Sequence, residues 1–170
     1  AGFFFRAELT VVSAKRCMYV VKAVLPQMKT WRGHIHLAIA PTKMMERMEW
    51  LAEKATEIGF DELSLLNCQF SERRQVKIIR LEKIVISAVK QSRKAWKPLV
   101  HEMKDFKSFV ESRQGTRCFI AHCYDEVPKK DLYDELTKYA GNEDITVLIG
   151  PEGDFSIEEV NFALECGCES

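Results

Sequence analysis

One stretch near the end of the chain combines the signals of a strand, a glycine turn and a helix start. Residues 145–149 are apolar or β-branched throughout, which is typical of a buried strand. Gly150-Pro151-Glu152-Gly153 then turns the chain, because glycines permit positive φ and proline fixes its own φ. Ser156 and Glu159 have the spacing of a capping box. The pattern predicts a backbone-lined ligand loop at the carboxyl end of a strand, with an ordinary strand–helix connection as the alternative.

The residue types in this loop favour a neutral or cationic ligand. The chain has neither Gly-x-Gly-x-x-Gly nor the Gly-Lys-Ser/Thr of a P-loop. A helix N-terminus attracts anions, but Glu152 and Asp154 lie beside this one. Phosphate is therefore a poor candidate for this position.

Two histidines raise the question of a metal. His34 and His36 project from the same face of a strand expected over residues 34–40. A protein zinc site needs three or four ligands, and no third ligand lies near them in the sequence. We therefore expect no metal.

Length and composition indicate a globular protein with one sizeable core. The chain has 170 residues, 46% of them hydrophobic and 29% charged. No stretch approaches the length of a membrane span, and the first residues do not resemble a signal peptide. The six cysteines have no C-x-x-C spacing, so we expect reduced thiols and a cytoplasmic location.

The zero net charge hides an uneven distribution. Residues 71–104 contain ten Lys and Arg against three Glu, a net +7. Residues 125–170 contain three Lys against thirteen Asp and Glu, a net −10. This asymmetry suggests one surface for a polyanion and another that is solvated or meets a partner.

The hydrophobic periodicity alternates between strands and helices, which predicts an α/β fold with a parallel sheet and helices on both faces. The expected strands cover residues 7–12, 18–24, 34–40, 63–66, 118–121 and 145–149, and the expected helices cover residues 42–58, 76–95, 105–111, 130–139 and 157–166. Thr42 is the expected cap of the first helix. The first two strands cannot form a stable sheet alone, so we expect them to be the end of a small β-domain.

One expected helix is basic. On the helix over residues 76–95, Lys83, Lys90, Lys94 and Lys97 cluster opposite the apolar side. Such a face is either solvated or a nucleic-acid surface.

Several motifs, in this order, resemble the SPOUT-class RNA methyltransferases. The best match is the RsmE-type group, which methylates N3 of a uridine in small-subunit (16S) ribosomal RNA. The resemblance covers about residues 34–170 and is carried by residues 40–43, 45–50, 53–59, 68–73, 90–92 and 148–156.

The resemblance implies a trefoil-knot methyltransferase fold, a homodimer and S-adenosyl-L-methionine (SAM) as methyl donor, bound by three loops. Residues 1–32 would be the C-terminal part of a PUA-like β-barrel RNA-binding domain plus a linker, and residues 33–170 the methyltransferase domain. On this comparison we expect the chain to be truncated at both ends, without the third cofactor loop and the closure of the knot.

The resemblance also implies roles for individual residues. Arg73 would stabilise the uracil anion and Glu152 would accept a proton or orient the sulfonium. For Arg73 the alternative is an ion pair with Glu72 or Glu57, and for Glu152 it is turn capping. Cofactor binding would involve Ala121, His122, Leu148, Ile149, Gly150, Pro151 and Gly153, and RNA binding would involve Gln91, Arg93, Lys94 and Lys97.

Two other classes of function stay open. The first is a non-catalytic RNA-binding protein in which the basic helix binds RNA and the glycine turn is structural. The second is another α/β enzyme that uses the Gly-Pro-Glu-Gly loop for a different nucleotide-like ligand.

Overall fold

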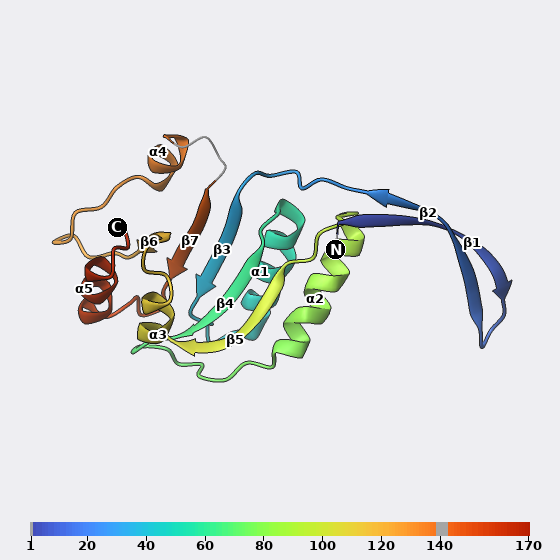
Figure 1. Cartoon of the computed structure of the whole chain (residues 1–170). Helices are drawn as coiled ribbons and strands as arrows, with labels where there is room; N and C mark the ends of the chain where they lie inside the picture. Colours follow the sequence, from blue (N-terminus) through green and yellow to red (C-terminus); the bar gives the residue numbers. More distant parts are fainter. Residues whose placement is uncertain (1, 139–142) are drawn as a thin grey trace.

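A five-stranded parallel sheet forms the body of the protein (Figure 1). The computed structural model describes residues 2–138 and 143–170. The strand order is β5 (Leu99–Asp105), β4 (Glu62–Asn67), β3 (His34–Ile39), β7 (Asp144–Ile149) and β6 (Arg117–Ala121), and every pairing in it is parallel. The predicted parallel α/β sheet is confirmed.

Helices cover both faces of this sheet. On one face, α1 (Met45–Ile58) and α2 (Ile78–Gln91) pack against Leu63 and Leu65 of β4. On the other face, α3 (Phe106–Glu111) and α5 (Ile157–Glu165) pack against alternate residues of the strands, such as Leu66. The two-residue period of a strand sends neighbouring side chains to opposite faces, so one strand contributes to both cores.

An antiparallel hairpin precedes the body and extends away from it (Figure 1). It consists of β1 (Phe3–Val12) and β2 (Cys17–Pro26), which confirms the two predicted strands at greater length. Apolar side chains are exposed along it, among them Val12 at 70% and Tyr19 at 65%. Two strands with so little burial are at best marginally stable on their own.

Two tryptophans hold the base of the hairpin on the body. The backbone N–H of Gly2 donates to Ala95 O at 2.8 Å, and Gly2 lies against the ring of Trp96. Trp31 donates from Nε1 to Asp61 Oδ2 at 2.9 Å. Gly59, at the end of α1, has φ +129°, and a Cβ there would come within 2.6 Å of the Trp31 ring. Glycine is therefore needed at position 59 for both the turn and the close contact.

The basic helix is shorter than predicted. Helix α2 spans Ile78–Gln91, and Arg93 adopts a left-handed conformation with φ +52°. Lys94 and Lys97 therefore lie beyond the helix, and the prediction that they share its basic face is wrong. A lysine-rich pattern continued past the end of the helix, and periodicity alone does not locate that end.

Two other differences concern local signals. Thr42 does not cap α1, which begins at Met45; its hydroxyl donates to Met44 O instead. The sequence analysis missed β5, an edge strand whose residues are half polar and mostly accessible to solvent.

Helix α4 is Leu132–Thr137, and the predicted continuation to residue 139 ends outside the described residues. No helix in the described ranges has the length and apolar character needed to cross a membrane.

Helix α5 has the predicted capping box. Ser156 accepts from the Glu159 N–H, and the Glu159 carboxylate accepts from the Ser156 N–H. We predict that Ser156→Ala lowers the free energy of unfolding by about 1 kcal/mol, because it leaves a helix N–H without its partner. Urea denaturation measures this change. Ser87→Ala on the exposed side of α2 is the matched control and should have no such effect.

Candidate cofactor and RNA site

The loop after β7 turns tightly because the chain folds back onto its first residue. A Cβ at Gly150 would lie 3.0 Å from the Phe155 nitrogen, so any other residue would need a small shift of the loop backbone. We predicted that Gly150 and Gly153 supply positive φ, and this is wrong. The left-handed residue is Asp154, with φ +67°, and its carboxylate compensates by accepting from the Phe155 N–H at 2.7 Å.

Asp154 also ties this loop to the loop after β6. Its second oxygen accepts from the Cys123 N–H at 2.7 Å. The Tyr124 hydroxyl donates to Phe155 O at 2.9 Å and joins the same two loops again. The carboxyl ends of the neighbouring strands β6 and β7 therefore carry one connected structure.

His122 is buried within the loop after β6. Its Nδ1 accepts from the Tyr124 N–H at 3.2 Å, which leaves the proton on Nε2 to be donated to Ser170 Oγ at 2.8 Å. Both ring nitrogens are thus used inside the protein. In this arrangement His122 shapes the loop, and its backbone is the part available to a ligand.

The two predicted catalytic residues meet at one peptide group after β3. Arg73 Nε donates to Thr42 O at 3.2 Å, and Glu152 Oε1 accepts from the Lys43 N–H at 2.8 Å. These two backbone atoms belong to the same peptide unit. A second nitrogen of Arg73 donates to Lys43 O. The structure therefore brings Arg73 and Glu152 together from loops far apart in the sequence.

These contacts bear on the alternatives given for both residues. Glu72 pairs with Lys43 at 3.0 Å and Glu57 pairs with Lys54 at 3.0 Å, so the expected alternative of an ion pair to Arg73 is wrong. For Glu152 the structure has the capping arrangement. Hydrogen bonds from its own backbone N–H and from that of Lys43 lower the pKa of Glu152, so it is a carboxylate at neutral pH.

The loop after β4 joins the same structure through α5. The Gln69 N–H donates to Glu159 Oε1 at 2.8 Å, and Ser71 Oγ accepts from the Cys68 N–H at 3.0 Å. Phe70 lies close to Gly153. A Cβ added at Gly153 would be 3.4 Å from the Cβ of Phe70. Four loops at the carboxyl edge of the sheet are thus hydrogen-bonded to one another or in contact.

Arg73 lies between two solvent-filled hollows. One, of about 420 Å³, is lined by Met45, Arg73, Gln75, Val76, Lys77 and Arg80. The other, of about 410 Å³, is lined by Lys43, Glu72, Arg73, Arg74 and Gln75. Both linings are rich in Lys and Arg, which attract an anionic ligand such as a nucleic acid.

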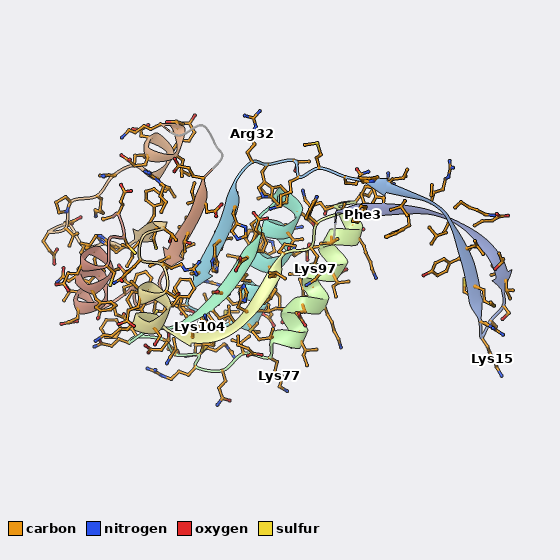
Figure 2. All side chains as sticks on the ribbon, in the orientation of Figure 1. Phe3, Lys15, Arg32, Lys77, Lys97 and Lys104 are labelled. Carbon is orange, nitrogen blue, oxygen red and sulfur yellow. The ribbon has the colours of Figure 1, made fainter. Side chains whose placement is uncertain are left out.

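The predicted RNA-binding residues lie at the other end of α2. Figure 2 labels Lys77 and Lys97, which lie near opposite ends of this helix. Gln91 ends the helix, and Lys94 reaches back to Ile58 O at 3.3 Å with its ammonium 5.4 Å from the Trp31 ring centre. Lys97 donates to the carbonyl of Pro98. Within one chain they are not brought together with Arg73.

The predicted cofactor residues differ in what they can offer. Ala121 and Ile149 are neighbours in register at the ends of β6 and β7 and are both exposed. Leu148 and Pro151 are buried, so they can contribute only backbone. The sequence analysis missed the roles of Asp154, Tyr124 and Glu159 in linking the loops. An acidic residue after a Gly-x-x-Gly turn was the available signal for Asp154.

The sequence that forms this sheet and its loops matches the model of a known protein family. The family model for the RNA methyltransferase domain matches residues 29–170. The chain belongs to this family. The match covers the parallel sheet, its helices and all of the loops described above.

Two curated bacterial relatives are named as small-subunit ribosomal RNA methyltransferases. The chain is 22% identical over 156 residues to the ribosomal RNA small subunit methyltransferase E of Rickettsia conorii, covering 92% of this chain and 62% of the relative. It is 29% identical over 128 residues to methyltransferase E 2 of Borreliella burgdorferi, covering 71% and 50%. The chain thus spans between half and two thirds of the length of these two relatives.

Solved structures share the fold. A probable rRNA-methyltransferase from Porphyromonas gingivalis superimposes with a TM-score of 0.90 at 39% identity, covering 99% of this chain and 70% of that one. A ribosomal RNA small subunit methyltransferase E from Neisseria gonorrhoeae, bound to S-adenosyl methionine, gives 0.82 at 22% identity, covering 99% and 69%.

The double role of Asp154 can be separated by substitution. We predict that Asp154→Ala lowers the free energy of unfolding by about 2 kcal/mol, because it removes charge-assisted hydrogen bonds and leaves alanine in the left-handed region. Asp154→Gly should lie between the wild type and the alanine variant, since it relieves only the backbone. Urea denaturation measures the order, and the fully exposed Asp125→Ala is the control. Equal stability of Asp154→Ala and wild type would contradict the linking role.

The lowered pKa of Glu152 predicts a pH-dependent stability difference. A depressed folded-state pKa stabilises the fold above the unfolded value, about 4.3 for glutamate, and this contribution is lost as the pH falls through the folded-state pKa. Wild type should therefore be more stable than Glu152→Gln at neutral pH, and the two should converge in acid. Thermal unfolding between neutral and acidic pH checks this, and a gap that widens in acid would contradict it.

Proposed function

We propose that this protein uses S-adenosyl-L-methionine to methylate N3 of a specific uridine in small-subunit (16S) ribosomal RNA. The names of the curated relatives support the substrate, and the bound ligand of the Neisseria gonorrhoeae structure supports the cofactor. The observation that carries the proposal is the meeting of Arg73 and Glu152 at one peptide group beside the Gly150–Gly153 loop.

The residues at the sheet edge fit this cofactor. SAM supplies a methyl group bonded to a cationic sulfur. Ala121 and Ile149 offer small and apolar exposed surface at adjacent strand ends, and Gly153 leaves backbone accessible. Glu152 is an exposed carboxylate whose lowered pKa keeps it charged, which suits a cation and not a phosphate.

Arg73 is placed to act on the uracil. N3 of uridine must lose its proton before it becomes a good nucleophile, and a cation beside the adjacent carbonyl oxygens stabilises the anion that forms. A guanidinium has five N–H groups. Two nitrogens of Arg73 hold the carbonyls of Thr42 and Lys43, which fixes the plane of the group, and the remaining N–H groups are available to a base.

The RNA would extend from this edge along α2. A helix rises about 1.5 Å per residue, so Ile78–Gln91 is about 20 Å long, a distance that a few nucleotides of RNA can span. We place Gln91, Arg93, Lys94 and Lys97 in contact with RNA at the far end of this path. We also propose that the protein is a homodimer in the cytoplasm and that residues 1–32 belong to a PUA-like RNA-binding barrel, where the exposed apolar hairpin would be covered.

Binding of the cofactor separates the three classes of function. Isothermal titration calorimetry with SAM and S-adenosylhomocysteine, on protein expressed from its complete reading frame, should give heat with both. Heat with neither would favour a non-catalytic RNA-binding protein. Heat with a different nucleotide-like ligand alone would favour another α/β enzyme.

Arg73 provides the sharper test of mechanism. We predict that Arg73→Ala abolishes methylation, measured by mass mapping of 16S rRNA in a strain that lacks the enzyme, while SAM binding measured by calorimetry is retained. Arg73→Lys keeps the charge but loses the planar fork, so it should recover only part of the activity. Loss of SAM binding together with methylation would instead assign Arg73 a structural role.

A further inference from the structure

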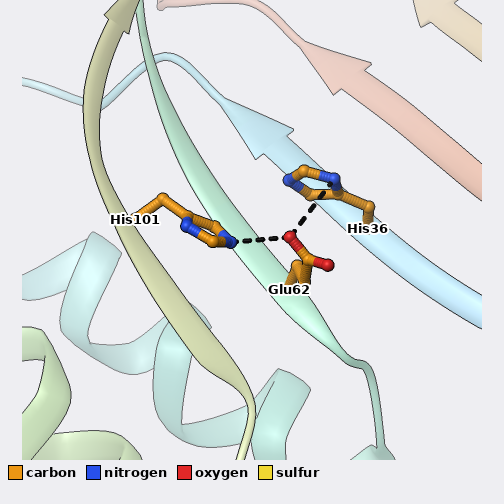
Figure 3. Close-up of side chains that lie close together, drawn as sticks. All are labelled: His36, Glu62 and His101. Atoms are coloured by element: carbon orange, nitrogen blue, oxygen red, sulfur yellow. Dashed lines mark hydrogen bonds and ion pairs between the residues drawn. The ribbon is translucent and has the colours of Figure 1, made fainter. Parts of the chain in front are cut away.

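A second cluster of polar side chains lies near the amino ends of the strands, away from the loops described above. His36 is on β3, Glu62 is the first residue of β4 and His101 is near the start of β5, and the three converge on one face of the sheet (Figure 3). His36 and Glu62 are partners in the strand register. Nitrogen and oxygen atoms of the three residues lie within 4.8 Å of one another.

Both histidines point a ring nitrogen toward the same carboxylate oxygen, Glu62 Oε2. His101 Nε2 lies 2.6 Å from Glu62 Oε2, and His36 Nδ1 lies 3.9 Å from that oxygen. The imidazole rings of His36 and His101 have centres 5.9 Å apart. The His36 ring is also held edge-on against Phe109, with ring centres 5.4 Å apart. The donor atoms are therefore set by packing and by strand register.

His36 has one nitrogen satisfied and one that lacks a partner. Its side chain is 4% exposed, and Nε2 lies 2.8 Å from Ser64 Oγ. The other ring nitrogen, Nδ1, faces Glu62 Oε2 at 3.9 Å, which is too long for a hydrogen bond. Within the described residues this buried nitrogen has no hydrogen-bond partner.

A buried ring nitrogen that faces a carboxylate without a hydrogen bond is in a position that a bound cation can satisfy. We propose that His36, Glu62 and His101 form a binding site for a divalent transition-metal ion of the zinc class. Two imidazoles and one carboxylate are a donor set of protein zinc sites, in which a fourth position remains for solvent. The ion would take the place of the hydrogen bond between His101 and Glu62, and Nδ1 of His36 would be its third protein ligand.

The geometry needs only small adjustments. Zinc bonds of about 2.0–2.1 Å in a tetrahedron place ligand atoms about 3.3 Å apart. The His101–Glu62 contact of 2.6 Å would lengthen and the His36–Glu62 contact of 3.9 Å would shorten. Both changes are within reach of side-chain rotation by Glu62 and His101, whose side chains are 24% and 36% exposed and leave an entry path.

Outer contacts support the ligands. Ser64 Oγ orients the His36 ring through its contact with Nε2, and His34 Nε2 lies 2.8 Å from Glu62 Oε1, the oxygen that the metal would not use. Such contacts orient the ligands of a metal site and keep them basic. The positive charge of Arg113 would repel a metal ion at this site. Its guanidinium lies 5.7 Å from the ring centre of Phe109, which packs against His36. The site joins β3 and β4 to the edge strand β5, so its expected effect is on stability and not on methyl transfer.

Metal binding can be measured directly on the protein. Titration with Zn²⁺ by calorimetry and with Co²⁺ by visible absorption should give one ion per chain. His101→Ala and Glu62→Gln should each weaken binding at least about tenfold. Glu102→Gln is the matched control, because it changes an exposed carboxylate of β5 outside the cluster and should bind metal as the wild type does. Zn²⁺ should raise the melting temperature of wild type and control but not of the two variants.

Three results would overturn the proposal. The first is no binding by wild-type protein. The second is binding that survives both His101→Ala and Glu62→Gln with unchanged affinity. The third is a cobalt–thiolate charge-transfer band, which would assign the ion to the free cysteines. Circular dichroism of His101→Ala, whose side chain lies on a partly exposed edge strand, verifies that loss of binding is not loss of the fold.

Discussion

Three carboxylates within residues 152–159 hold the edge of the sheet together. Glu152, Asp154 and Glu159 accept backbone N–H groups from Lys43, Cys123 and Gln69, and these belong to the loops after β3, β6 and β4. Hydrogen bonds to charged groups contribute about 1.5–3 kcal/mol each, more than neutral ones. The loops would otherwise have no regular structure to position them. The segment after β7 therefore acts as the centre to which the other loops are attached.

This use of acidic residues explains part of the charge asymmetry of the sequence. The net charge of −10 over residues 125–170 suggested a solvated surface or a partner. Part of it instead accepts hydrogen bonds from backbone N–H groups of the neighbouring loops. Four basic residues of the 71–104 segment line the hollows described above, namely Arg73, Arg74, Lys77 and Arg80. Attraction of RNA and stabilisation of the loops are thus assigned to different parts of the chain.

The sequence was sufficient for the parallel sheet, the helices on both faces and the position of the turn between β7 and α5, because strand–helix alternation and capping residues are local signals. It was not sufficient for contacts that depend on the register of distant strands. The meeting of Arg73 with the Thr42–Lys43 peptide and the positive φ of Asp154 both required the folded chain. The same holds for His36 and His34, since their partner Glu62 comes from another strand.

The junction between hairpin and body has a practical consequence for spectroscopy. Two of the three tryptophans, Trp31 and Trp96, lie at this junction, and the ammonium of Lys29 is 5.8 Å and 5.6 Å from their ring centres. The third, Trp50, is 64% exposed on α1. Indole emission shifts to longer wavelength as water gains access to the ring. The intrinsic fluorescence of the unlabelled protein is therefore a built-in reporter of whether the N-terminal hairpin is docked or released.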